Sequence, residues 1–145
     1  MKISKSTILT SVTIPFLVTS AIALCADITR GLYQLETQTL MPHLDEMRHK
    51  TRRSTACFDG EQIQQLFPIM RQPGLKDCYF RQSSVTDGTA FFRLECDGLN
   101  GAVGTAILKS DKGRLKAVLD AKLGGKNMTF TQTSWARKLG DCVGG

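Results

Sequence analysis

Two histidines and two acidic residues form the one cluster in this sequence with the chemistry of a metal site. His43, Asp45, Glu46 and His49 lie within seven consecutive residues, and imidazole and carboxylate groups bind borderline and hard cations. Their spacing matches no rigid metal motif such as H-E-x-x-H. We therefore expect a solvated loop and no cofactor, and keep His43, Asp45 and His49 only as weak metal candidates.

A basic run follows this cluster directly. Arg48, Lys50 and Arg52 are separated by single residues, so a strand would carry them on one face, where they could meet an anionic partner. Charges on an edge strand also prevent pairing with other sheets, and we adopt that interpretation. Tyr33 and Trp135 could line a groove for an apolar ligand, although core or rim packing is the interpretation we prefer.

Signs of catalysis or nucleic-acid binding are missing from the sequence. Nucleophilic catalysis needs a base beside a hydroxyl or thiol, and the chain has two histidines only. It contains no nucleophile elbow, phosphate-binding loop or dinucleotide fingerprint. The formal charge is +6 for the full chain and +4 without Lys2 and Lys5, and +4 is too small for a nucleic-acid footprint. We predict a protein that is not an enzyme and does not bind nucleic acid.

The first 25 residues have the layout of a secretory signal peptide. Lys2 and Lys5 precede the uncharged run 8–24, and Ala21 and Ala23 occupy the positions that a signal peptidase reads. Cleavage after Ala23 or after Cys25 fits the pattern. Pro15 and several hydroxyl residues argue against a permanent anchor. We predict a periplasmic or secreted protein without a stable membrane span, with a single domain over 26–145.

Cysteine content supports export. Cys25 lies at the signal boundary, and the remaining cysteines are Cys57, Cys78, Cys96 and Cys142. Four cysteines in an exported chain predict two disulfides. The sequence has no C-x2-C pairs of the kind that zinc sites and redox motifs use.

Disulfide connectivity can be narrowed by strand geometry. Asp87-Gly88 indicates a two-residue hairpin turn, which would place Tyr79 opposite Cys96. Cys78 and Cys96 would then point to opposite faces of the sheet and could not bond. Two pairings stay open: Cys57–Cys96 with Cys78–Cys142, and Cys57–Cys78 with Cys96–Cys142. We predict Cys57–Cys78 with Cys96–Cys142, because this pairing closes the smaller loops.

Short alternating segments separated by glycine-containing turns indicate an antiparallel sheet. We expect strands at 31–40, 48–57, 78–85, 89–96, 102–109, 115–123 and 128–136. One short helix is expected over 59–67, with Asp59 as N-cap and Pro68 as its stop. The predicted fold is mainly β, a curved antiparallel sheet of about seven strands that forms a half-barrel or sandwich around this helix.

Several motifs in fixed order resemble a known family. They are Gly31-Leu32-Tyr33, Met41-Pro42, Cys57 followed by Leu66-Phe67-Pro68, Cys78, Cys96-Asp97-Gly98 with Gly101 and Gly104, and the ending Ala136-Arg137-Lys138-Leu139-Gly140-Asp141-Cys142. The chain resembles the small exported bacterial proteins of the domain-of-unknown-function family numbered 3617. One departure is Tyr33, where that family usually has tryptophan. The resemblance implies a periplasmic, disulfide-bonded, mostly β domain, and it carries over no catalytic residue.

Three functional hypotheses follow. The first is a non-enzymatic binding module for an unknown periplasmic protein or small ligand, which would bind through one sheet face or the open mouth of the curled sheet. The second is an inhibitor of a cell-wall hydrolase that presents the loop 43–49, although a positively charged chain is poorly matched to a basic lysozyme. The third is a metal-binding protein that uses His43, Asp45 and His49.

Overall fold

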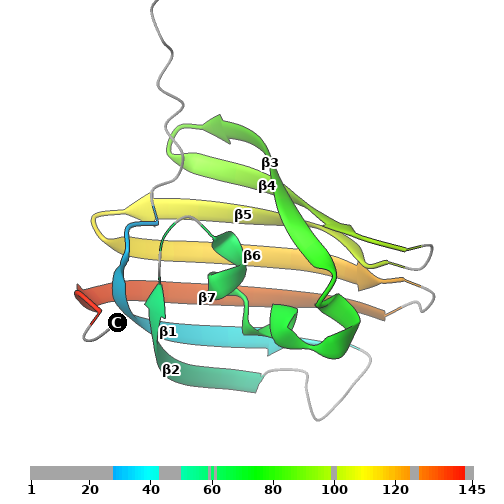
Figure 1. Ribbon diagram of the computed structural model, residues 1–145, viewed down its shortest axis with the longest axis horizontal. Helices are drawn as coiled ribbons and strands as arrows, with labels where there is room; N and C mark the ends of the chain where they lie inside the picture. The colour runs from blue at the N-terminus through cyan, green and yellow to red at the C-terminus, as the bar shows by residue number, and fades with distance from the viewer. Residues whose placement is uncertain are drawn as a thin grey trace, which may run out of the picture.

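The computed structural model describes residues 28–42, 50–58, 60, 62–98, 101–124 and 128–142. Seven strands form one open antiparallel sheet (Figure 1). They are β1 (Gly31–Leu40), β2 (Lys50–Phe58), β3 (Cys78–Thr86), β4 (Thr89–Cys96), β5 (Val103–Asp111), β6 (Arg114–Leu123) and β7 (Met128–Gly140). The mainly β prediction is confirmed, and the sheet is single rather than a sandwich.

Strand order explains how the chain ends meet. The order is β2-β1-β7-β6-β5-β4-β3, so β3 to β7 form a meander and β1 pairs with the last strand. The strands β2 and β3 follow one another in sequence but form opposite edges of the sheet. The segment that joins them must therefore cross one face.

Two tight turns have the backbone that their sequences predict. Asp87 and Gly88 have φ angles of 49° and 70°, and Lys112 and Gly113 have φ angles of 45° and 76°. Positive φ at both central residues is the mark of a type I′ hairpin turn, whose twist matches that of the flanking strands.

One face of the sheet, here called the inner face, carries the core. On β6 the alternation predicted from the sequence is confirmed, because its apolar side chains are buried or half-buried on one face. The segment between β2 and β3 contains three short 3-10 turns that lie over this face (Figure 1). They are η2 (Ile63–Leu66), η3 (Pro68–Arg71) and η4 (Pro73–Leu75).

The short helix predicted over 59–67 is present in part and is a 3-10 turn. Among the described residues of that range, only Ile63–Leu66 is helical, and it has no side-chain N-cap bond. Asp59 lies outside the described residues. Pro68 and Pro73 begin the next two turns, and a proline lacks the N–H that a continuous helix needs. Burial follows the prediction nevertheless, since Ile63, Leu66 and Phe67 are all buried.

The predicted disulfide pairing is also wrong. The structure joins Cys78 to Cys96, with Cα atoms 3.9 Å apart, because a β-bulge changes the register of the hairpin. Gln82 pairs with Phe92 while Ser84 pairs with Phe91, so Ser83 is an extra residue. The turn has two residues as predicted, but the bulge moves Cys78 from the position opposite residue 97 to the position opposite Cys96.

The second disulfide joins Cys57 to Cys142, with Cα atoms 5.7 Å apart. Leu32 on β1 pairs with Cys57 on one side and with Gly140 on the other, so this bond links the two neighbours of β1. A Cys57–Cys78 bond would have joined β2 to β3, the two opposite edges of the sheet. Five strands separate these edges, so the two cysteines lie too far apart for a disulfide.

The predicted signal peptide and Cys25 lie outside the described residues, so the cleavage site stays a prediction. None of the helices in the described part of the chain has the length and apolar character needed to cross a membrane.

We predict that the two disulfides stabilise the fold unequally. The Cys57–Cys142 bond closes a separation of 85 residues and the Cys78–Cys96 bond one of 18. Loop entropy gives about 4–5 and about 3 kcal/mol for these bonds, so Cys57→Ala/Cys142→Ala should lower the free energy of unfolding more than Cys78→Ala/Cys96→Ala. Urea unfolding of both variants measures this. Equal losses, or a Cys57–Cys78 peptide in non-reducing mass mapping, would contradict it.

Candidate functional site

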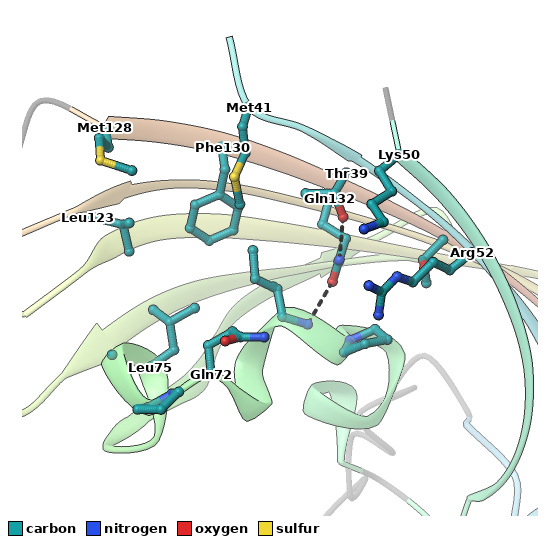
Figure 2. Close-up of a pocket in the computed structure, with 15 residues that line it drawn as sticks. Thr39, Met41, Lys50, Arg52, Gln72, Leu75, Leu123, Met128, Phe130 and Gln132 are labelled. Carbon is teal, nitrogen blue, oxygen red and sulfur yellow. Dashed lines mark hydrogen bonds between the residues drawn. The ribbon is translucent and has the colours of Figure 1, made fainter. Parts of the chain in front are cut away.

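A pocket of about 500 Å³ lies between the inner face and the 3-10 turns (Figure 2). Small-molecule sites in proteins usually have volumes of about 300–1,000 Å³. Its lining residues are Thr37, Thr39, Met41, Lys50, Arg52, Pro68, Ile69, Gln72, Pro73, Gly74, Leu75, Leu123, Met128, Phe130 and Gln132. Strands β1, β2, β6 and β7 form one wall, and η3 and η4 form the other.

One end of the pocket is apolar. Phe130 and Leu75 are buried, while Met41, Leu123 and Met128 are half-buried. Figure 2 shows Met41, Phe130, Leu123 and Met128 together at this end, on the sheet side. Methionine side chains are flexible and polarisable, so they adapt to ligands of varied shape.

The other end of the pocket is cationic. Lys50 and Arg52 extend into it from the edge strand β2 (Figure 2), and they pair in register with Thr39 and Thr37. Neither cation has an ion-pair partner among the described residues, and the described lining contains no Asp or Glu. Within the described structure, two positive charges without a carboxylate partner therefore stand at this end.

Two other arginines of the sheet, Arg53 and Arg81, are paired with carboxylates. Arg53, the next residue on β2, donates from Nε to Oε2 of Glu36 at 2.7 Å. Arg81 donates to Oε2 of Glu95 at 3.2 Å. The pKa of Arg81 is raised above its ordinary value, chiefly by a hydrogen bond with the Tyr79 side chain and then by the charge of Glu95. Lys50 and Arg52 differ from these exposed arginines in having no carboxylate partner within the described structure.

Gln132 connects the sheet to the three 3-10 turns η2, η3 and η4, here called the cover. Its side chain is only 4% exposed, and its Nε2 donates to Oγ1 of Thr39 at 2.7 Å. Its Oε1 accepts a hydrogen bond from the backbone N–H of Ile69 at 3.2 Å. The amide therefore holds η3 at a fixed height above the sheet, and both bonds lie in the wall of the pocket (Figure 2).

The candidate residues from the sequence fall in different places. Lys50 and Arg52 line the pocket. Tyr33 is 2% exposed, stacks on Phe58 with ring centroids 4.7 Å apart, and donates its hydroxyl to the Thr29 carbonyl at 2.9 Å. It is therefore a core residue.

Trp135 lies on the outer face and is 39% exposed. It pairs in register with Glu36 and Lys116 and borders a second depression of about 470 Å³ that also contains Arg53 and Arg137. Trp135 and the pair Lys50 and Arg52 thus belong to opposite faces of the sheet.

Several sequence candidates lie outside the described residues. These are Arg48, His43, Asp45 and His49. The whole loop 43–49, proposed for hydrolase inhibition, also lies outside them. Within the described ranges, no three His, Cys, Asp or Glu side chains gather in a way that could hold a metal ion. The metal-site and inhibitor hypotheses both stay sequence predictions.

The family model described as "Protein of unknown function (DUF3617)" matches residues 28–142. The chain belongs to DUF3617. This confirms the resemblance seen in the sequence, and the matched range contains all seven strands and both disulfides. No curated protein and no solved structure matches the chain.

Sequence reasoning missed most of the pocket of this DUF3617 protein. Gln132 was the residue that could have been found, since the alternation of β7 places it between Phe130 and Ser134 on the buried face. A long polar side chain at a core position needs a buried hydrogen-bond partner. The apolar end comes from residues of four separate segments, so no local pattern reveals it.

We predict that Gln132→Ala loosens the cover. The substitution leaves the Ile69 N–H without its acceptor, and an unpaired buried donor costs about 1–3 kcal/mol. The free energy of unfolding should fall by that amount, and amide exchange should accelerate over 68–75. Thr133→Ala, the next residue on the opposite face, is the matched control. Unchanged exchange in Gln132→Ala would contradict the assigned role.

Proposed function

We propose that this DUF3617 protein is a non-enzymatic binding protein that holds a small apolar molecule in the pocket beneath η3 and η4. The observation that carries this proposal is the pocket itself. Its volume of about 500 Å³ suits a small ligand, and concave apolar sites with a few polar groups are the usual form of such sites. This proposal keeps the binding module expected from the sequence and assigns its ligand to this pocket.

The lining residues favour binding over catalysis. Those that belong to the described ranges include no carboxylate, imidazole or thiol, which are the groups that usually serve as general bases or nucleophiles. The polar atoms present are hydroxyls, amides and two cations. Such groups orient a ligand by hydrogen bonds and charge without transferring protons at neutral pH.

The same proposal places the protein outside the cytoplasm. Its support is the pair of disulfides, Cys57–Cys142 and Cys78–Cys96, because such bonds persist in oxidising compartments and are rare in the cytosol. Together with the signal-like residues 1–25, this suggests a periplasmic or secreted binding protein whose ligand is met after export.

An uncharged fluorescent probe tests the proposal. Purified protein should bind N-phenylnaphthylamine, with a rise in its emission as the dye leaves water. Leu123→Glu should weaken binding by about tenfold or more, because it introduces a carboxylate at the apolar end. Leu123 is half-buried, so the fold should tolerate the change.

Val103→Glu is the matched control. Val103 is 62% exposed and does not line the pocket, so this substitution adds the same charge without affecting the site. No emission change with the unmodified protein, or an equal loss in both variants with unchanged folding, would refute binding in this pocket.

A further inference from the structure

We infer that the ligand is a single-chain amphiphile with an oxyanion headgroup, its hydrocarbon tail lying at the apolar end and its head beside Lys50 and Arg52. This inference rests on the proposed function and adds the chemical class and the orientation of the ligand. Carboxylate and phosphate heads share the required chemistry, and the experiment below separates them.

The pocket has an apolar end and a cationic end, and this is why we assign the hydrocarbon tail to the apolar end. Met41, Phe130, Leu123 and Met128 occupy one end, and Lys50 and Arg52 extend from the other, as Figure 2 shows. A molecule that fills the pocket must therefore present hydrocarbon to one end and compensate positive charge at the other. A wholly apolar molecule meets only the first condition, and a small inorganic anion meets only the second.

The two cations suit an oxyanion. They lie two residues apart on one face of β2, and no described carboxylate neutralises them. An arginine guanidinium presents donors in a planar fork that matches a carboxylate or phosphate, and a lysine adds a mobile point charge. Their exposure lets the fold carry them without a ligand, while a bound head would bring them a partner.

A hydroxyl donor completes the head site. Thr39 accepts the hydrogen bond from Gln132 Nε2, so its own hydroxyl hydrogen is available to an acceptor in the pocket. Thr39 pairs directly with Lys50 in register. A headgroup oxygen between them would meet a cation and a hydroxyl donor, and the Gln132 bond fixes the orientation of that hydroxyl.

The apolar end of the pocket suits a hydrocarbon tail. Phe130 and Leu75 supply rigid buried surface, and the half-buried methionines adapt to chain length. Each methylene buried contributes about 0.8 kcal/mol, which is close to a fourfold change in affinity. Affinity should therefore rise from octanoate to decanoate to dodecanoate if the tail occupies this end.

The test is a comparison of ligands that differ only in their heads. Dodecanoate, dodecyl phosphate, dodecanol and inorganic phosphate are titrated, below their aggregation concentrations, against protein loaded with N-phenylnaphthylamine. Dodecanoate or dodecyl phosphate should displace the dye with at least about tenfold higher affinity than dodecanol, the effect expected from one or two charge-assisted hydrogen bonds. Which of the two acids binds tighter identifies the headgroup.

Variants connect that preference to the two cations. Lys50→Ala and Arg52→Ala should each lower the affinity for the anionic amphiphile by about tenfold and leave dodecanol binding unchanged. Arg53→Ala is the matched control, because it removes a charge from the same strand on the opposite face. Circular dichroism and urea midpoints verify that all three variants are folded.

The outcomes separate the two proposals. If dodecanol binds as tightly as the acids while Leu123→Glu still weakens dye binding, the headgroup assignment is wrong and the apolar binding function stands. If inorganic phosphate binds as tightly as dodecyl phosphate, the site is a plain anion site and the amphiphile is refuted. If no probe binds at all, both proposals fail.

Discussion

The chain must cross the whole inner face once, and the rest of the structure depends on that crossing. Because β2 and β3 are consecutive in sequence but form opposite edges, the segment between them spans six strand spacings, about 29 Å on a flat sheet. It covers this face, and its own side chains Leu66 and Phe67 are almost fully buried. A seven-stranded sheet with one apolar face would otherwise leave that face in water.

The crossing is diagonal, and this explains where the pocket lies. The segment leaves β2 after Phe58, beside the start of β1, and enters β3 at Cys78, which faces Cys96 at the other end of the strands. A diagonal cover leaves the far corner of β1 and β2 unfilled. Lys50 and Arg52 lie at that corner. The cover does not bury them, so their charges stay exposed and are not desolvated. The same pattern that protects an exposed edge from other sheets thus forms one wall of the pocket.

Local patterns in the sequence predicted the strands well, because alternation and glycine turns are short-range signals. The bulge at Ser83 was missed, although a signal existed. Phe80 and Val85 both pack against the core, yet they are five positions apart and would face opposite sides of a regular strand. One inserted residue reconciles them and also brings Cys78 opposite Cys96. Of the pocket lining, Lys50 and Arg52 were named from the sequence as possible binding residues, although the edge-strand interpretation was preferred. The apolar end depends on strand order, which no local pattern contains.

The cover is attached in two different ways, and the difference bears on function. Its first part is held by apolar packing. Phe67 is fully buried, and its ring is tilted against that of Phe80, with the ring centroids 5.6 Å apart. Its second part, η3, is tied to the sheet by the Gln132 amide, whose bonds lie in the pocket wall. A ligand that contacts Thr39 or Gln132 therefore acts on the group that positions the cover. Since a molecule that binds only the folded state stabilises it by mass action, occupancy of the pocket should tighten η3 and η4 while the packed half at Phe67 stays unchanged.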